Sequence, residues 1–565
     1  MSSTPHEYQV LVVGAGPVGL ALAGDLALRN IESCVIERTD GTIEQPRMDM
    51  VGIRTMEFAR RWGIVGDVEA SPYPRDYPQD NVYVTSLVGY ELGRQRMPAI
   101  GKDRPPATSP QKRERCPQDM FDPILQRWAR SFDRVTLRYR CELIGLDRRG
   151  DRVEARVHDH ERGTTESVIA RYVVGCDGAA SPVRESVGIP MTGAAVLTHT
   201  TNVIFRDPHL TERHDKGRCY RFILVGTEGT WATIVAINGD DRWRMSIVRS
   251  PEGGLSTSEI EDCIRRAVGI DFPFEILSVT NWKRRELVAA RYAEGRVFLA
   301  GDSAHSMSPT GGFGMNTGIG DAVDLSWKLQ ARLDGWGGNA LLTSYTAERR
   351  PIAERNAREA SANLARMLSP GDNPALCDPT PAGHALRRQL GIDFAAAMNH
   401  EWHTIGIHLG YRYDDSPIIV PDGTPAPPMD VAVYRPTTRP GARAPHAWLP
   451  DGRSTLDLFG SRFVLLNLGG EAADCLGIEN AARHRRVPLE TVTVGDESIR
   501  ALYERRYVLV RPDGHVAWRS DEAPTDPPAI IDCVRGELPA IASEATARSR
   551  PMSEGRVLFR LAESD

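Results

Sequence analysis

The sequence predicts a multidomain α/β protein on three grounds. The pattern G-x-G-x-x-G occurs within VVGAGPVGLALAG, residues 12–24, between an apolar stretch and a helix-forming one. Residues 198–248 alternate apolar and polar side chains, which is typical of antiparallel strands with one wet face. A Pro/Gly-rich stretch, residues 421–445, precedes further buried strands and marks a linker to a smaller C-terminal domain.

Composition excludes several classes of protein. The chain has 565 residues and a formal net charge of -6, with acids and bases interspersed, so neither nucleic acid nor an anionic membrane is an expected partner. Its nine cysteines stand singly, without the spacing of a disulfide framework or a metal site. No leader pattern and no run of eighteen apolar residues occurs, so a cytoplasmic protein is expected.

The first element is a βαβ unit. Residues 8–13 predict a buried strand, residues 18–28 a helix, and residues 33–36 a second strand that ends in Glu37. Such a unit places the pyrophosphate of a dinucleotide at the positive N-terminal end of the helix. Glu37 lies about twenty residues after the glycines, where an acid accepts hydrogen bonds from the adenosine ribose.

Each glycine of the loop has a geometric task. Gly14 allows the tight turn, Gly16 lets the backbone approach the pyrophosphate, and Gly19 lets the helix pack closely on the strand.

The following elements are expected in chain order. Residues 72–117 are rich in Pro, Arg and Tyr and predict irregular structure with one strand at 81–87. A helix at 117–132 is followed by strands at 135–139, 153–157 and 172–176.

A second ligand segment follows the antiparallel region. Residues 297–300 predict a strand that ends at Gly301 and Asp302, the edge of a parallel sheet where ligands collect. A Pro/Gly loop then leads to a helix that starts near Met315, and residues 344–367 predict a long amphipathic helix.

Three motifs together carry a resemblance: the loop 14–19 with Glu37, the segment GCDGAASPVRESVG at 175–188, and GRVFLAGDSAHSMSPTGGFGMNTGIGDAVDLSWKL at 295–329. In this order they resemble the FAD-dependent aromatic hydroxylases, the class A flavoprotein monooxygenases related to para-hydroxybenzoate and phenol hydroxylases. The resemblance covers about residues 8–370.

The resemblance implies a glutathione-reductase-type, Rossmann-like FAD-binding domain, an inserted mixed or antiparallel β-sheet substrate domain, and a C-terminal thioredoxin-like α/β domain. It assigns 1–72, 112–190 and 290–370 to the FAD-binding domain and 73–111 and 191–289 to the substrate domain. Residues 371–430 then form a helical segment and linker, and 431–565 form the thioredoxin-like domain. Its two cysteines, Cys475 and Cys533, lie far apart in sequence, so this domain is expected to be redox-inert and to serve packing or homodimer contacts.

The resemblance also implies which residues contact FAD. In the first βαβ unit and the helix near residue 118 they are Gly14, Gly16, Pro17, Gly19, Glu37, Arg38, Arg47 and Gln118. In the two later motifs they are Asp177, Gly178, Arg184, Gly301, Asp302, Pro309, Gly312, Gly314, Met315 and Asn316. NAD(P)H is expected as a transient co-substrate, because no second dinucleotide motif occurs. No metal is expected.

Asp49 and Pro309 are the candidate catalytic residues. In the family, flavin reduced by NAD(P)H reacts with O2 to a C4a-hydroperoxide that hydroxylates an electron-rich ring. Asp49 matches the phenol hydroxylase branch, where an aspartate beside the substrate hydroxyl assists removal of its proton. The alternative is a loop carboxylate that pairs with Arg47 or Arg54.

The sequence leaves the substrate open. A small phenol or phenolic acid is favoured, and a polycyclic polyketide or antibiotic-type aromatic is the alternative. Arg218, Tyr220, Arg221 and Arg244 are available to bind it, but none is selected. His305 is expected to bond neighbouring backbone rather than act in catalysis. A flavoprotein that only sequesters a reactive ligand is also compatible with the motifs, whereas the tryptophan signature of flavin-dependent halogenases does not occur.

Overall fold

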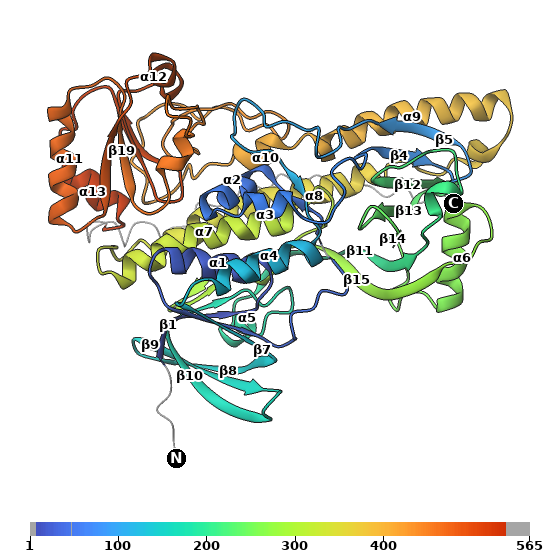
Figure 1. The fold of residues 1–565 in the computed structure, drawn as a ribbon, viewed down its shortest axis with the longest axis horizontal. Helices are drawn as coiled ribbons and strands as arrows, with labels where there is room; N and C mark the ends of the chain where they lie inside the picture. Colours follow the sequence, from blue (N-terminus) through green and yellow to red (C-terminus); the bar gives the residue numbers. More distant parts are fainter. Residues whose placement is uncertain (1–6, 47, 538–565) are drawn as a thin grey trace, which may run out of the picture.

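The computed structural model describes residues 7–46 and 48–537. The position of Arg47, a predicted FAD contact, and the last part of the predicted C-terminal domain, residues 538–565, lie outside the described residues. Three large sheets with their helices form three lobes of the molecule (Figure 1). The first sheet lies at the bottom of this view, the second at the right, and the C-terminal sheet at the upper left.

The first sheet contains the predicted dinucleotide unit. Its order is β16-β17-β10-β1-β2-β7, and β8 and β9 extend it antiparallel from β10. The strands are β1 (Glu7–Val13), β2 (Ser33–Glu37), β7 (Val135–Tyr139), β8 (Cys141–Arg149), β9 (Arg152–Asp159), β10 (Thr164–Gly175), β16 (Ala293–Glu294) and β17 (Val297–Leu299). Strand β1 pairs in parallel with both β10 and β2, so the three predicted ligand motifs follow strands of one parallel sheet.

Three helices cover this sheet next to the dinucleotide loop: α1 (Pro17–Leu28), α4 (Gln118–Arg130) and α7 (Phe313–Leu333). Helix α1 is buried on nearly all sides, which explains its uniformly small and apolar sequence. Glycine permits the close contact of α1 with α7, because a Cβ on Gly318 would lie 2.6 Å from Val18 Cγ2.

The second sheet has the order β18-β15-β11-β14-β13-β12-β4-β5. Its strands are β4 (Asn81–Val84), β5 (Glu91–Gln95), β11 (Met191–Arg206), β12 (Arg221–Gly226), β13 (Gly229–Ala236), β14 (Arg242–Val248), β15 (Glu275–Ala289) and β18 (His305–Ser306). One face packs on α6 (Thr257–Val268) through an apolar cluster that includes Phe205, Phe222 and Met245. The other face carries polar side chains, among them Asn202 and Arg244, beside a second apolar cluster that includes Ile223 and Val225.

The third sheet, in the order β20-β19-β21-β22, has a thioredoxin-like topology. Strand β19 (Phe463–Asn467) pairs in parallel with β20 (Leu489–Thr493) and antiparallel with β21 (Tyr507–Val510), which in turn pairs with β22 (Val516–Ser520). Its helices are α11 (Ala472–His484), α12 (Glu497–Tyr503) and α13 (Pro527–Val534). The fold class predicted from the sequence is therefore confirmed.

A buried ion network joins the third sheet to the helices of the first lobe. Arg511, which follows β21, pairs with Glu348 of α8 (Ser344–Met367) at 2.5 Å and with Asp324 of α7 at 3.0 Å. Lys328 of α7 bridges the same two carboxylates, and all four side chains are buried. Each charge has opposite partners, as buried charges require, so the C-terminal lobe is fixed to α7 and α8.

Short elements connect these parts: β3 (Met50–Val51), β6 (Glu114–Arg115), α2 (Ile53–Trp62), α3 (Val65–Glu69), α5 (Pro182–Ser186), α9 (Pro381–Trp402) and α10 (Ile405–Leu409). Most predicted elements occur, but boundaries differ. Strand β10 begins at Thr164 rather than Tyr172, and α7 begins at Phe313 rather than near Met315. None of the helices in the described part of the chain combines the length and apolar character needed to cross a membrane.

Candidate cofactor and substrate site

The dinucleotide loop has the geometry that its glycines predict. Gly14 has φ +105°, and a Cβ there would lie 2.4 Å from the carbonyl oxygen of Cys176. A Cβ on Gly19 would lie 2.0 Å from the carbonyl oxygen of Gly14. A Cβ on Gly16, in contrast, would meet no atom within 4 Å. The loop is therefore closed towards the protein and open at Gly16, on the side where a pyrophosphate would approach.

Two helices begin next to this region without side-chain caps. Helix α1 starts at Pro17, and α7 starts after Gly312, which has φ +67°. Neither helix has a capping side chain or an acid in its first turn. Their free N–H groups and positive ends suit the two anionic parts of reduced FAD, the pyrophosphate and the pyrimidine edge of the flavin. The residues present therefore fit FAD.

Glu37 lies at the rim of the dinucleotide loop. Its carboxylate accepts hydrogen bonds from the Ala15 N–H at 3.0 Å and from the N–H and hydroxyl of Thr39. Each oxygen retains a lone pair, so these bonds orient the carboxylate and leave it able to accept a ribose hydroxyl. Arg38, the next residue, is exposed.

The loop after β17 is held from below by α7. The Gly301 N–H donates to Asp321 at 3.1 Å, and His305 Nε2 lies 2.8 Å from the same Asp321 oxygen. The other carboxylate oxygen of Asp321 pairs with Arg349 Nε at 2.7 Å. His305 is fully buried, so it has a structural role, although its partner is a carboxylate rather than the backbone that we expected. Asp302, directly after Gly301, is exposed.

The segment after β10 braces that same loop. Asp177 accepts hydrogen bonds from the Ser181 hydroxyl and the Val183 N–H, and burial raises its pKa. Arg184 is buried and donates to the carbonyl oxygens of Ala179 and Ser303, both at 3.1 Å. Arg184 thus ties two predicted ligand segments to each other. Gly178, directly after Asp177, has φ +85°.

The start of α7 is tied to β3, the short strand that directly follows Asp49. The Asn316 amide accepts from the Gly52 N–H at 2.7 Å and donates to the carbonyl oxygen of Met50 at 3.2 Å. Gly314 and Met315 lie half-buried in the same turn, and Pro309 is exposed in the loop before it. Gln118 starts α4 with its N–H donating to the Met48 carbonyl oxygen. Asp49 therefore lies one residue from two segments that contact the predicted FAD loops.

Asp49 is held by three side chains from separate parts of the chain. Its carboxylate accepts a hydrogen bond from Tyr220 at 2.5 Å and pairs with Arg115 at 3.0 Å and Arg244 at 3.4 Å. Burial favours a higher pKa for Asp49, but the two guanidinium groups and the Tyr220 hydroxyl outweigh it and lower the pKa.

Tyr220 and Arg115 also contact each other. The Arg115 guanidinium carbon lies 3.6 Å from the centroid of the Tyr220 ring, and burial raises the pKa of the Tyr220 hydroxyl. Tyr220 therefore keeps its proton and remains a donor. Arg54, the alternative partner of Asp49 in the sequence, instead pairs with Glu57 at 2.7 Å.

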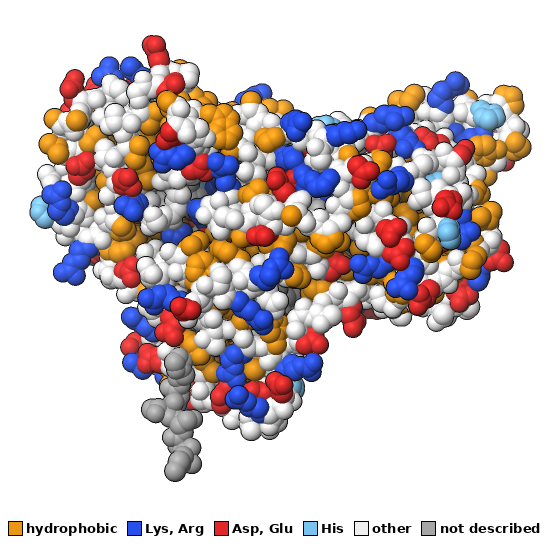
Figure 2. Space-filling model, viewed as in Figure 1, with side chains coloured by type: hydrophobic (Ala, Val, Ile, Leu, Met, Phe, Trp, Pro, Cys, Tyr) orange, Lys and Arg blue, Asp and Glu red, His pale blue; other side chains and the backbone are white. Residues whose placement is uncertain are grey.

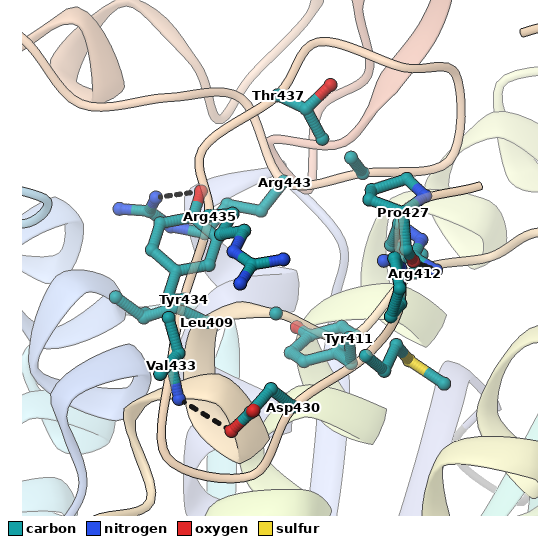
Figure 3. A pocket seen from close by; sticks show the side chains of 14 residues that line it. Leu409, Tyr411, Arg412, Pro427, Asp430, Val433, Tyr434, Arg435, Thr437 and Arg443 are labelled. Carbon is teal, nitrogen blue, oxygen red and sulfur yellow. Dashed lines mark hydrogen bonds between the residues drawn. The ribbon is translucent and has the colours of Figure 1, made fainter. Parts of the chain in front are cut away.

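A surface pocket lies elsewhere, at the junction with the C-terminal lobe. Figure 3 shows Tyr411, Tyr434 and Arg443 at its wall, with Arg443 bonded to the Tyr434 hydroxyl. Its lining includes none of the predicted FAD or catalytic residues. The face of the molecule seen in Figure 2 mixes acidic and basic side chains.

The comparisons with known proteins agree with this geometry. Residues 7–360 match the family described as FAD binding domain, and residues 437–536 match the family described as aromatic-ring hydroxylase, C-terminal. A putative polyketide hydroxylase of Streptomyces halstedii is 34% identical over 92% of this chain and 94% of its own length. The 2,4-dichlorophenol 6-monooxygenase of Cupriavidus pinatubonensis is 30% identical over 92% of this chain and 94% of its own length.

Solved structures agree over nearly the whole chain. The rebeccamycin biosynthetic enzyme RebC with reduced flavin has a TM-score of 0.88 and 40% identity, covering 95% of this chain and 100% of that one. Aklavinone-11 hydroxylase with FAD and aklavinone has a TM-score of 0.79 and 29% identity, covering 94% and 99%. FAD is the cofactor of this fold, and the resemblance drawn from the three motifs is confirmed: the chain belongs to the FAD-dependent aromatic hydroxylases, the class A flavoprotein monooxygenases.

Proposed function

We propose that the protein hydroxylates an aromatic ring that carries an acidic hydroxyl, with NAD(P)H as transient reductant and O2 as oxidant. The observation that carries the proposal is the cluster of half-buried Asp49 with buried Tyr220 and Arg115, one residue from the segment that contacts the FAD loops. FAD supplies the chemistry that no side chain can: it accepts hydride from NAD(P)H and activates O2.

The role proposed for Asp49 is to hold the substrate hydroxyl. Because its pKa is lowered, Asp49 is ionised throughout the neutral range and offers a hydrogen-bond acceptor. A carboxylate with a low pKa is a weak base, so it draws electron density into the ring by accepting a hydrogen bond and takes the proton only from an acidic phenol. This refines the simple proton-abstraction role that the sequence predicts.

Tyr220 and Arg115 are proposed to fix the geometry of that acceptor. Tyr220 donates to one carboxylate oxygen and Arg115 pairs with the other, so the carboxylate cannot rotate. Arg115 also supplies a positive charge that stabilises negative charge developing on the substrate oxygen. Pro309 and the uncapped first turn of α7 would form the wall next to the flavin, with the N–H groups of that turn towards its pyrimidine edge.

The FAD contacts proposed for the loops follow from the same geometry. Gly14, Gly16 and Gly19 would shape the pyrophosphate side, Glu37 would accept from the ribose, and Asp302 would accept from the ribityl chain. Asp177 and Arg184 would act by bracing the loop that carries Asp302.

The substrate class is supported by relatives with different substrates in their names, a dichlorophenol and polyketides. Asp49 would recognise an acidic ring hydroxyl, whether the substrate is a small phenol or a larger polyketide. The test is to reconstitute the protein with FAD and follow NADH and NADPH oxidation with 2,4-dichlorophenol, 4-hydroxybenzoate, 3-hydroxy-2-naphthoate and chromopyrrolic acid. Hydroxylated product that rises in step with NAD(P)H oxidation supports the proposal, and oxidation without product for every compound contradicts it.

A further inference from the structure

The polar face of the second sheet turns towards the cofactor loop. The strand register places Arg221 of β12, Arg244 of β14 and Asn202 of β11 on the face opposite the apolar cluster that packs on α6. Arg221 is buried and Asn202 and Arg244 are half-buried, so the polar atoms of this face that are shielded from solvent need a hydrogen-bond partner.

Arg284 of β15 lies against this face without an acidic partner. It is 5% exposed, and among the described residues no carboxylate lies within ion-pair distance of its guanidinium group. Its Nε donates to the Thr200 hydroxyl at 3.1 Å and its Nη1 to the Ser308 hydroxyl at 3.4 Å. Its guanidinium carbon also lies 5.5 Å from the centroid of the Trp282 ring. A buried guanidinium held by two hydroxyls and a ring is costly, because none of these groups carries the negative charge that would neutralise it.

The neighbouring arginines differ from Arg284 in this respect. Arg221 pairs with Glu401 at 3.0 Å, and Arg244 pairs with Asp49. Burial lowers the pKa of Arg284 to about 10, and repulsion from Arg221 and Arg244 adds to the effect, with Glu401 opposing it. Arg284 thus remains protonated at neutral pH and close enough to both neighbours to be repelled by them.

Unpartnered polar atoms gather on the same face. Trp282 Nε1, Asn202 Oδ1 and Tyr83 Oη are buried and make no hydrogen bond within the described structure. Glu401 Oε2 is a fourth such atom, while Glu401 Oε1 accepts from Arg221 and from the Gly311 N–H. Buried atoms of this kind mark a place where a polar ligand or water completes the bonding.

The position of Arg284 connects this face to the flavin wall. Ser308, its hydrogen-bond partner, directly precedes Pro309, and Glu401 links Arg221 to the same loop at Gly311. Asp49 lies on the other side of Arg244, at a distance of 3.4 Å between the charged atoms. A substrate ring next to Pro309 could thus reach Asp49 with one substituent and Arg284 with another.

We propose that the substrate carries a carboxylate in addition to its ring hydroxyl, and that Arg284 is the specificity-determining residue that binds this carboxylate. The inference rests on the proposed hydroxylase function and narrows its substrate to aromatic acids. The carboxylate supplies the counter-ion that the chain does not provide, and the planar fork of Arg284 matches it in shape.

The test compares ligands that differ only in the carboxylate. Oxidised FAD-loaded protein is titrated with 4-hydroxybenzoate against phenol, and with 3-hydroxy-2-naphthoate against 2-naphthol, while the flavin absorption spectrum reports binding. At least one acid binds about 30-fold more tightly than its neutral partner in the unmodified protein, as expected when a buried charge gains its partner. Arg284→Met removes this preference and leaves the neutral partner's affinity unchanged, and Arg284→Lys restores part of it.

Arg285→Met is the matched control, because Arg285 is adjacent on β15 and its side chain alternates to the other face. It keeps the preference for the acid. Equal binding of acid and neutral partner in the unmodified protein overturns the inference, as does an equal loss for both in Arg284→Met. Failure of FAD to bind, or of any phenol to be hydroxylated, contradicts the proposed function instead, whereas hydroxylation of phenols without preference for acids contradicts this inference alone.

Discussion

The hydroxyl of Tyr220 donates a hydrogen bond to Asp49 Oδ2 at 2.5 Å, although the two residues lie 171 positions apart in the sequence. This bond joins the second sheet to the short strand beside the cofactor loops. It leaves the other carboxylate oxygen to Arg115 and fixes the carboxylate in one orientation. Each residue of the pair can be tested by its own substitution.

Removing the charge of Asp49 should separate FAD reduction from hydroxylation. In Asp49→Asn the amide keeps the shape of the side chain but cannot polarise a substrate hydroxyl in the same way. Product formation should fall about 100-fold, which is the usual range for general acid–base groups, with FAD content unchanged. Product yield per NAD(P)H oxidised measures the effect, and a fully coupled Asp49→Asn enzyme would remove Asp49 from the reaction.

Removing the hydroxyl of Tyr220 should shift the acidic limb of the pH–kcat/KM profile. Burial alone would raise the pKa of Asp49, and Arg115, Arg244 and the Tyr220 hydroxyl lower it. In Tyr220→Phe one lowering contribution is lost, so the pKa of Asp49 rises and its ionised form is lost at a higher pH. The acidic limb of kcat/KM should therefore shift to higher pH than in the unmodified enzyme. An identical limb in both proteins would show that Asp49 does not set it.

Gly16 should tolerate a side chain in the fold but not in the complex with FAD. Its backbone is extended, with φ -74° and ψ -178°, and a Cβ would meet no protein atom. Gly16→Ala should leave the unfolding midpoint of the FAD-free protein unchanged. It should lower the affinity for FAD at least about tenfold, or about 1.4 kcal/mol. Gly19→Ala is the contrasting variant, because its Cβ would lie 2.0 Å from the Gly14 carbonyl oxygen and should destabilise the fold itself. Unchanged FAD affinity in Gly16→Ala would show that no pyrophosphate approaches there.

Asp122 should make stability fall as pH rises. It is buried below Gln118, and burial, opposed by the Gln118 hydrogen bond, raises its pKa to about 7 in the folded protein. The unfolded value is about 3.9, so the folded state binds the proton more tightly and its stability decreases between about pH 4 and pH 7. Asp122→Asn should therefore gain stability relative to the unmodified protein by about 2–3 kcal/mol more at pH 8 than at pH 5. Urea unfolding at both pH values measures this, and a pH-independent difference would refute it.

Arg511 should carry much of the attachment of the C-terminal lobe. Arg511→Met leaves the Glu348 and Asp324 carboxylates buried with one cation fewer, which costs about 3–5 kcal/mol. Arg505→Met is the control, because the Arg505–Asp521 pair, 3.5 Å apart, is partly exposed to solvent and contributes at most about 1 kcal/mol. The two unfolding curves in urea compare the variants. Equal stability of both would mean that the network does not fasten the lobe.

The sequence predicts features that lie within one short unit. Gly14, Gly19 and Glu37 belong to a single βαβ unit, so their spacing alone predicts their places. The network around Asp49 could not be predicted in this way, because Arg115 and Tyr220 come from β6 and from just before β12, and only the packing of two sheets brings them together. Arg284 resembles any strand arginine in the sequence, and only its burial and partners distinguish it.

Long-range packing also decides the partner of His305, which the sequence predicted wrongly, and that of Arg54, which the sequence offered only as an alternative partner of Asp49. Burial behind the Gly301 loop pairs His305 with Asp321 on α7, a side chain that local sequence cannot identify as its neighbour. Glu57 pairs with Arg54 and also with Arg443 of the Pro/Gly-rich stretch, so Asp49 pairs with other arginines. Ion pairs between distant segments therefore determine the partners of those site residues whose surroundings the sequence motifs do not predict.

The most direct test of the proposed hydroxylation is isotopic. The FAD-loaded protein is supplied with NAD(P)H, ¹⁸O2 and the aromatic acid that it binds most tightly. The mass of the product is then measured by mass spectrometry. We predict one ¹⁸O atom on the ring, formed in proportion to NAD(P)H consumed and lost in Asp49→Asn. A protein that binds FAD and the acid but incorporates no ¹⁸O would contradict the claim that this site hydroxylates its ligand.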